Sequence, residues 1–180
     1  MKFRSLAFFP ILLLVLAILT SGGRRDPLPP GNFHVVEEGV LFRSAQPNPE
    51  NMVYLENLGI KTILNLRYRI NDQRETKNTH LKVIHLKLKA QSITFEDMVN
   101  GLIAIRNAEK PTLIHCLHGS DRTGCLAACY RIVFQNWDKE KAIAEFRKEL
   151  YGYNYRWFPN LLVFLETLDV DALKKRVLIK

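Results

Sequence analysis

Cysteine is scarce in this sequence: three residues in 180, too few and odd in number for a disulfide framework. Nine glycines and eight prolines show no collagen-like enrichment, and only one apolar run is long, which excludes a protein that spans the membrane several times. Disorder is excluded because 47% of the residues are hydrophobic. The length allows one domain and hardly two, and that domain is large enough to bury a core without covalent staples.

Acidic residues are also few: 18 Asp and Glu stand against 26 Lys and Arg, for a net charge of +8. Only Lys2 and Arg4 of the basic residues fall in the acid-free first 22 residues, so 24 remain against the same 18 acids. Such an excess raises the local concentration of anionic ligands, namely phosphoesters, anionic lipids or nucleic acid. The alternative is a solvated basic surface without a dedicated partner.

Residues 1–23 are predicted to be a signal peptide or a membrane anchor. The apolar stretch from Leu6 to Leu19 is shorter than the roughly 20 residues that span a bilayer comfortably. Small residues after it suit cleavage, the pair of arginines that follows suits an anchor, and a buried core helix is a third alternative. We expect the protein to be exported across or tethered to a membrane, on its periplasmic or other extracytoplasmic side. A Pro-rich linker over 24–32 precedes the domain predicted at 33–180.

Alternating apolar residues and capped helical patterns divide the domain into short elements. Strands are expected at 33–36, 40–42, 60–66, 83–88 and 112–115, and helices at 49–59, 95–103, 122–135, 138–150 and 159–168. Strands alternating with helices predict an α/β fold: a compact single domain with a central, largely parallel sheet flanked by helices. Ligands bind beyond the carboxyl ends of such strands, so the junction at 115–124 is the expected ligand crevice.

The chemistry is concentrated at that junction. A buried strand ends at Cys116, and Arg122 opens a helix. A short loop there turns backbone N–H groups inward and makes a nest for anions, to which the helix N-terminus adds partial positive charge. Gly119 supplies backbone freedom, and Arg122 can donate two hydrogen bonds to one phosphate. This positive field favours a nucleophilic thiolate at Cys116, and the Thr123 hydroxyl can donate to that sulfur.

The spacing of cysteine and arginine is weak evidence by itself, because Cys125 and Arg131 repeat it. This second match lacks a preceding strand, an internal glycine and a hydroxyl after its arginine, and it falls inside a predicted helix. We interpret Cys125 and Cys129, four apart on that helix, as core thiols.

The run His-Cys-x-x-Gly-x-Asp-Arg-Thr-Gly at 115–124 resembles the signature loop of the cysteine-based protein tyrosine and dual-specificity phosphatase superfamily. Residues 40–47, 62–67 and 128–131 are similar to its small atypical dual-specificity branch and that branch's bacterial relatives. The resemblance covers residues 33–165 in order. It implies a compact α/β fold of the dual-specificity phosphatase type, a phosphocysteine intermediate, and no metal or cofactor.

The resemblance also implies roles for individual residues. Cys116 would attack phosphorus, Arg122 would hold the equatorial oxygens, and Thr123 would assist release of the thiolate. His115 would orient the loop by hydrogen bonding, which is also what a buried structural histidine does. The phosphate-binding cradle is expected from Leu117, His118, Gly119, Ser120, Asp121 and Arg122.

The general acid is harder to assign. The superfamily usually places an Asp about thirty residues before the cysteine, whereas residues 83–92 contain no acid. Asp121 inside the loop is one substitute, and Asp72 or Glu75 on a neighbouring loop is another. Asp97 fits a helix cap better. Without a dedicated acid, proton delivery to the leaving group slows by about 10²–10⁴-fold.

Two other features have alternative interpretations. Arg43 either braces the active-site loop or pairs with a surface acid. An aromatic segment before Pro159 either lines a substrate mouth or packs as a loop; its members are Tyr151, Tyr153, Tyr155, Arg156 and Trp157.

Taken together, the sequence predicts a cysteine-dependent phosphomonoester hydrolase acting on phosphotyrosine, phosphoproteins or inositol phosphates. An anionic membrane surface is a further candidate partner, and no nucleic acid is expected. Ser120 stands where many inositide-cleaving relatives carry Lys. The alternatives are a phosphate-binding module with little turnover, a redox protein using Cys116 with another cysteine, and a zinc site, against which the crowding of ligands beside Arg122 argues.

Overall fold

Five short strands form one sheet at the centre of the computed structural model, which describes residues 28–179. The strands are β1 (His34–Glu37), β2 (Leu41–Ser44), β3 (Thr62–Asn65), β4 (Lys82–His85) and β5 (Thr112–His115). Their order is β1-β2-β5-β3-β4, and only β1 runs antiparallel to its neighbour. The predicted α/β fold with a largely parallel sheet is therefore confirmed.

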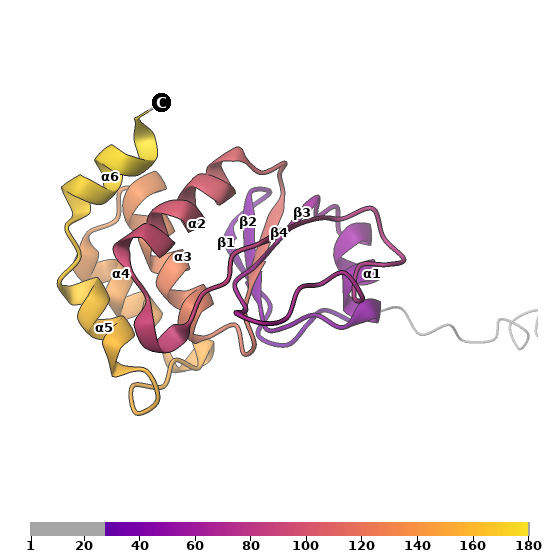
Figure 1. Cartoon of the computed structure of the whole chain (residues 1–180), viewed down its shortest axis with the longest axis horizontal. Helices are drawn as coiled ribbons and strands as arrows, with labels where there is room; N and C mark the ends of the chain where they lie inside the picture. The colour runs from indigo at the N-terminus through magenta and orange to yellow at the C-terminus, as the bar shows by residue number, and fades with distance from the viewer. Residues whose placement is uncertain (1–27, 180) are drawn as a thin grey trace, which may run out of the picture.

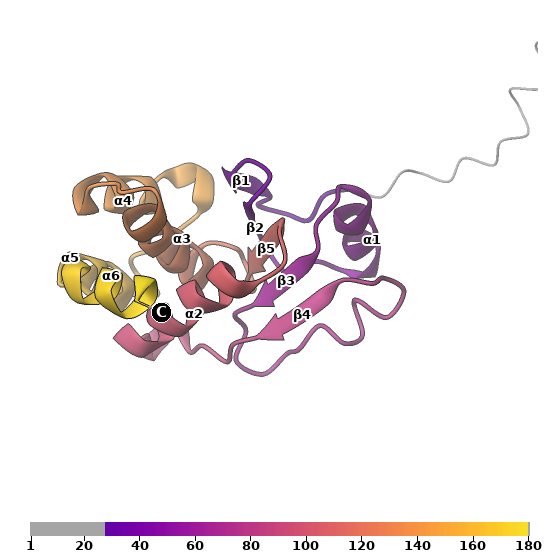
Figure 2. The ribbon, with the colours of Figure 1, turned by 90° about the horizontal axis from the view of Figure 1, so that it is seen from above.

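Helices cover both faces of this sheet unequally. One face carries α1 (Pro49–Asn57) alone, and the remaining helices pack on the other face (Figures 1 and 2). These are α2 (Phe95–Asn107), α3 (Asp121–Phe134), α4 (Lys139–Phe146), α5 (Pro159–Glu166) and α6 (Val170–Leu178), with short 3₁₀ turns η2 (Ala90–Ser92) and η3 (Glu149–Tyr151). The predicted caps Asn48 and Thr94 both accept a hydrogen bond from the third residue of their helix, as a capping residue should.

Side chains that alternate along each strand divide the core in two. Successive residues of a strand point to opposite faces, so neighbouring apolar residues enter different clusters. Phe42, Ile63 and Leu113 pack towards α1, and Leu41, Leu64 and Ile114 pack towards the larger helical layer. β5 is central and buried at every position, which fixes the point at which the chain emerges from it.

Several elements differ from the sequence prediction. The strand predicted at 83–88 is Lys82–His85, and the helix predicted at 95–103 continues to Asn107. The helix predicted at 138–150 ends at Phe146, because the backbone leaves the helix at Lys148 and forms η3, which Gly152 terminates with φ +74°. The chain also has α6, which was not predicted. Its signals are short: Asp169 caps the helix and only Leu173 and Val177 are buried on it.

The predicted signal peptide or anchor, residues 1–23, lies outside the described residues. Within 28–179, no helix is both long and apolar enough to cross a membrane. Residues 28–32, which we predicted to belong to a linker, contact the domain. Leu28 O accepts from the Asn51 side chain at 2.9 Å, and Gly31 O accepts from the Ala45 N–H at 2.8 Å.

Candidate active site

The candidate site is the loop between β5 and α3. Cys116 follows β5 directly and is 1% exposed. Gly119 sits in the left-handed region with φ +73°, and a Cβ there would lie 2.5 Å from the backbone carbon of Ser44. Both the conformation and this close approach require glycine. The loop therefore curls tightly against the end of β2.

Three consecutive carbonyl groups of this loop are held by donors outside it. Each bond comes from a different residue: Gln46 N–H to Leu117 O at 3.1 Å, Asn32 Nδ2 to His118 O at 2.9 Å, and Arg43 Nη2 to Gly119 O at 2.7 Å. A trans peptide is planar, and its C=O and N–H point in opposite directions. Holding these carbonyls on one side therefore turns the N–H groups of residues 118, 119 and 120 to the other.

The N–H groups turned to this side lack backbone partners. Outside the helices and strands of residues 28–179, no backbone–backbone hydrogen bond is donated by residues 117–122, an arrangement that is suited to binding an anion. The N-terminus of α3 begins at Asp121 and adds its own unpaired N–H groups and partial positive charge. The predicted phosphate-binding residues 117–122 are thus brought together around one concave stretch of backbone beside Cys116.

Arg122 is held beside this cradle only loosely. Its Nη1 donates to the carbonyls of Leu88, at 3.2 Å, and Leu66, at 3.4 Å, and its buried Nε has no partner in the described part of the chain. The two carbonyls belong to the segments that follow β4 and β3. The guanidinium is therefore positioned by neighbouring strand ends but keeps donors for a ligand.

Thr123 and His115 are both fully buried. Thr123 Oγ1 is buried without a hydrogen-bond partner among residues 28–179, so its hydroxyl is free to donate. Both ring nitrogens of His115 face oxygen acceptors: Nε2 lies 2.7 Å from Asp72 Oδ2, and Nδ1 lies 3.2 Å from Cys116 O. His115 thus contacts the first carbonyl group of the loop, and its loop-orienting role stays a prediction.

Asp72 is committed to this histidine, fully buried, with its second oxygen accepting from Gln46 at 2.8 Å. Burial by itself raises the pKa of the Asp72 carboxyl, but the hydrogen bond and charge of His115, with the hydrogen bond from Gln46, hold that pKa below its usual value. A carboxylate of this kind has no proton to give. Of the acids considered from the sequence, Asp72 is therefore a support for His115, and Asp97 caps α2.

Asp121 and Glu75 remain of the acids considered from the sequence. Asp121 is the first residue of α3 and is 7% exposed. Burial raises the pKa of the Asp121 carboxyl, although the Asn154 N–H and the charges of His118 and Arg122 offset part of this effect. Glu75 has one buried carboxylate oxygen without a partner among residues 28–179. A carboxyl that holds its proton to higher pH is suited to acid catalysis.

Arg43 braces the loop, which decides between its two interpretations. The side chain is 2% exposed, donates to Gly119 O, and lies with its guanidinium carbon 4.4 Å from the centre of the Tyr151 ring. Burial lowers the pKa of Arg43, and the nearby Tyr151 and Cys116 oppose this shift. A buried cation near Cys116 therefore holds this loop through Gly119 O.

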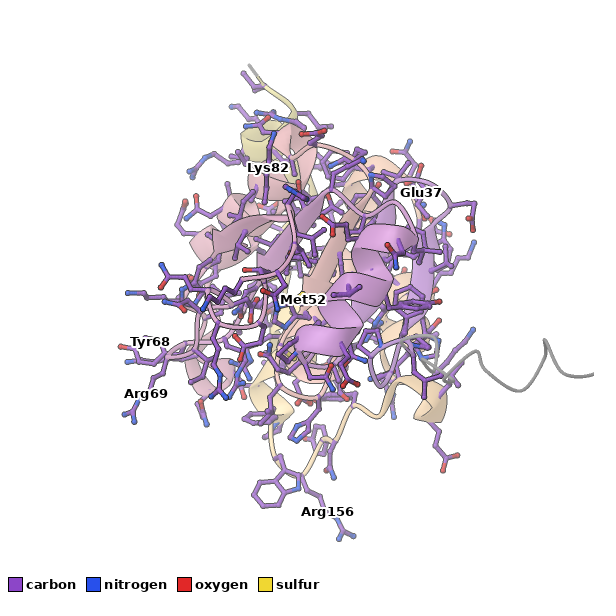
Figure 3. All side chains as sticks on the ribbon, turned by 90° about the vertical axis from the view of Figure 1, so that its right-hand side faces the viewer. Glu37, Met52, Tyr68, Arg69, Lys82 and Arg156 are labelled. Atoms are coloured by element: carbon purple, nitrogen blue, oxygen red, sulfur yellow. The ribbon has the colours of Figure 1, made fainter. Side chains whose placement is uncertain are left out.

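The aromatic segment before Pro159 divides into packed and exposed parts. Tyr151 packs on Arg43, and the Tyr153 ring packs at a tilt of 34° against Phe146, with ring centres 4.0 Å apart. Tyr155 and Trp157 are 57% and 75% exposed, and Arg156 projects from the end of the molecule (Figure 3). Trp157 and Phe158 line a cavity of about 350 Å³ that His118, Ser120 and Asp121 close on the loop side.

All three cysteines are buried and unpaired. Among residues 28–179, no group of three His, Cys, Asp or Glu side chains is arranged to hold a metal ion. Cys125 lies inside α3, where the hydrogen bond with Cys129, burial and the charge of Cys129 raise the pKa of its thiol. That environment fits the core role predicted for the pair.

Comparison with known proteins places this geometry in a family. Residues 27–178 match the model of the tyrosine phosphatase family. This chain belongs to the tyrosine phosphatase family. The resemblance inferred from the signature loop is thereby confirmed, as is its fold.

Members of the tyrosine phosphatase family that are named for different activities are similar to this chain. The dual specificity protein phosphatase TpbA of Pseudomonas aeruginosa is 34% identical over 136 residues, which are 74% of this chain and 62% of TpbA. The inositol diphosphatase DSP3 of Arabidopsis thaliana is 30% identical over 161 residues, 83% of this chain and 76% of DSP3. A crystal structure of TpbA in complex with phosphotyrosine superposes with a TM-score of 0.76 at 28% identity, covering 83% of this chain and 91% of that chain.

Sequence reasoning missed several residues that shape the loop in this tyrosine phosphatase family member. Asn32 was assigned to the linker, Gln46 only to a resembling motif, and Asp72 to acid catalysis. Each contacts the loop or His115 across 43 to 86 residues of sequence. The one local signal for these contacts was the residue type of Asn32. Asparagine tolerates the left-handed backbone that this residue adopts (φ 52°), and its side chain readily forms hydrogen bonds in turns.

Proposed function

We propose that this protein is a phosphomonoester hydrolase that works through a phosphocysteine intermediate. The observation that carries the proposal is the set of three outward-held carbonyls, which turns backbone N–H groups towards one point beside Cys116 and Arg122. A phosphoryl group with three equatorial oxygens needs converging donors of this kind. Two buried groups without a partner in the described chain, the Thr123 hydroxyl and the Arg122 Nε, support the same reaction.

The reaction has two steps. The Cys116 thiolate attacks phosphorus in line, a P–S bond forms, the P–O bond breaks, and the leaving oxygen takes a proton from an acid. Water then attacks the phosphocysteine, the P–S bond breaks, and inorganic phosphate leaves while the water's proton returns to the carboxylate. Thr123 donates to the sulfur as it departs, and the amides of 117–122 with Arg122 hold the oxygens throughout.

Asp121 is our choice for the acid, supported by its place in the loop and by the burial that raises the pKa of its carboxyl. Glu75 is the alternative, because one of its oxygens is buried without a partner in the described chain. Asp72 is excluded from our scheme by its commitment to His115.

Two substrate classes have support. The cavity walled by Trp157 and Phe158 beside Asp121 suits the ring of phosphotyrosine, the ligand in the TpbA complex. Basic side chains next in sequence to the carbonyls that hold Arg122 favour a polyanion, the class of substrate for which the inositol diphosphatase DSP3 is named. These are Arg67, Lys87 and Lys89. We propose phosphotyrosine as the first candidate and inositol diphosphates as the second.

The test is phosphate release by the full chain from an aryl phosphate, a phosphotyrosine peptide, an inositol hexakisphosphate and an inositol diphosphate. We expect Cys116→Ser to reduce the rate by at least about 10³-fold on every substrate. Cys125→Ser is the matched control with the same chemical change and should stay within about threefold. Bound phosphate without turnover of any substrate would identify the alternative, a phosphate-binding module.

We further propose that the domain acts on the extracytoplasmic side of a membrane. The support is the sequence of residues 1–23, with its basic start and apolar run. Alkaline phosphatase fused after residue 32 should be active in bacteria, because that reporter needs export. Fractionation of the full chain, with intact-mass measurement, then distinguishes a cleaved signal from a retained anchor on an anionic membrane.

A further inference from the structure

Asn32 connects three parts of the molecule through one side chain. Its Nδ2 donates to His118 O at 2.9 Å and to Tyr151 O at 3.1 Å. Its Oδ1 accepts from His34 Nε2 at 2.9 Å. The amide thus joins the start of β1, the loop after Cys116 and the end of η3. The residue adopts φ 52°, a left-handed conformation that asparagine tolerates better than most residues.

The bond to His118 O acts on one peptide of the cradle. Because the peptide between His118 and Gly119 is planar and trans, a fixed carbonyl direction fixes the opposite direction of the Gly119 N–H. The neighbouring peptides have their own holders, the Gln46 N–H and the Arg43 guanidinium. The Ser120 hydroxyl also approaches His118 O, but only at 3.4 Å. Asn32 is therefore the main donor that orients this N–H.

The orientation of the Asn32 amide is itself determined. His34 can donate only to the oxygen of that amide, so the nitrogen must face the two carbonyls. Burial and the charge of Arg43 lower the pKa of His34. The His34 ring also packs edge-on against Tyr151, with ring centres 5.0 Å apart. The donor is thus fixed before a ligand arrives, as a preorganised site requires.

We propose that Asn32 is a positioning residue for phosphate binding: its side-chain amide fixes the peptide between His118 and Gly119 so that the Gly119 N–H faces the bound phosphoryl group. The inference rests on the proposed function of the loop as a phosphate cradle. It extends the site beyond the signature loop, to a residue 84 positions before Cys116 in the sequence.

The test compares two asparagines that share a left-handed backbone. Asn32→Gly keeps φ accessible and removes only the amide, and Asn136→Gly makes the same change at φ 53° on an exposed residue outside the site. Asn32→Asp keeps the acceptor for His34 but turns an oxygen towards the two carbonyls. The full chain is assayed for kcat, KM, inhibition by inorganic phosphate and by orthovanadate, and thermal unfolding.

Loss of one hydrogen bond to a preorganised peptide corresponds to about a 5–10-fold weaker binding of phosphate and orthovanadate in Asn32→Gly. We expect a larger loss in Asn32→Asp and none in Asn136→Gly. Unchanged inhibition constants in Asn32→Gly, with activity lost only as the folded fraction falls, would overturn the proposal and leave a structural role. The outcomes separate the two proposals: a chain that binds phosphate without turning over substrate refutes the hydrolase but still tests Asn32, whereas a chain that binds no phosphate refutes both.

Discussion

Two segments of this chain share one spacing, a cysteine followed six positions later by an arginine, yet they have opposite surroundings. Cys116 directly follows the strand β5, and its arginine lies in the first turn of α3, after a loop whose carbonyls are held from outside. Cys125 and Arg131 lie within α3, where N–H groups are used by the helix itself. The comparison teaches that backbone direction, rather than the spacing of two side chains, makes an anion cradle.

The two arginines show the same contrast. Arg131 is satisfied by protein: Glu145 accepts two hydrogen bonds from it, the closer at 3.0 Å, Gln135 accepts one at 2.7 Å, and its guanidinium stacks on Trp137. Arg122 has only carbonyls at 3.2 Å or more, and a buried Nε without a partner in the described chain. Arg131 therefore uses its hydrogen-bond donors within the fold, whereas Arg122 retains donors for a ligand.

The largest difference should come from exchanging each arginine for alanine. Arg122→Ala should lower kcat/KM by at least about 10³-fold, because charge-assisted donors to the phosphoryl oxygens are lost. Arg131→Ala should leave kcat/KM within about threefold while the protein is folded. It should lower the free energy of unfolding by about 3 kcal/mol, because Glu145 becomes a buried, unpaired charge. Steady-state kinetics give kcat/KM and urea unfolding gives the free energy of unfolding for each variant. Equal losses of kcat/KM in the two variants would contradict the proposed difference between Arg122 and Arg131.

The sequence was sufficient for local features of this comparison. One short segment of sequence holds Thr112–His115, the glycine of the loop and the hydroxyl after Arg122. A strand, a tight loop and the start of a helix could therefore be predicted together. The placement of β5 between β2 and β3 was not predicted, because strand order depends on packing between distant segments.

The sequence offered only Arg43 as a brace of the loop, as one of two alternatives, and the contacts of the other residues that hold the loop or His115 were not predicted, for the same reason. Asn32, Arg43 and Asp72 contact it or His115 across long separations, and no periodicity links them. Asp72 is an example of a residue whose role could not be determined from the sequence alone. A carboxylate near the active site suggests an acid, but its burial and its partner determine whether it carries a proton.

The third position after each cysteine gives the next test. Gly119 is the third residue after Cys116, and Ala128 of α3 is the third residue after Cys125. Two separate variants replace each with the other's residue type. Gly119→Ala should lower kcat/KM by about 10²-fold or more, because the left-handed φ and the contact with Ser44 both oppose a Cβ and the loop must move. Ala128→Gly should lower the free energy of unfolding by about 1 kcal/mol, the usual cost of glycine in a helix, without changing kinetics.

The outcome is read from kinetics together with denaturant unfolding. A Gly119→Ala enzyme with normal KM and normal inhibition by phosphate would show that the cradle tolerates a shifted loop. In that case the difference between the two segments would lie in Arg122 alone.

The smallest expected effect on kinetics comes from the residue before each arginine. This is Asp121 before Arg122 and Tyr130 before Arg131. Both have a raised pKa: burial is the main cause for each, and Tyr130 also donates to Glu37 at 2.6 Å. If Asp121 is the acid, Asp121→Asn should slow substrates with poor leaving groups by about 10²-fold and spare aryl phosphates. The fall in wild-type kcat as pH rises through the raised Asp121 pKa should disappear. Tyr130→Phe should keep the wild-type pH profile.

Thermal unfolding across pH gives a second, independent reading of Asp121. A folded-state pKa above the unfolded value means that the folded chain binds the proton more tightly, so this stability is present at low pH and is lost as pH rises through the folded pKa. Asp121→Asn has no charge to bury, so its Tm should exceed the wild-type Tm at pH 7.5, and the difference should shrink towards pH 4. A variant less stable at pH 7.5 would mean that the Asp121 carboxylate is stabilised when ionised, and the acid role would then pass to Glu75, tested as Glu75→Gln.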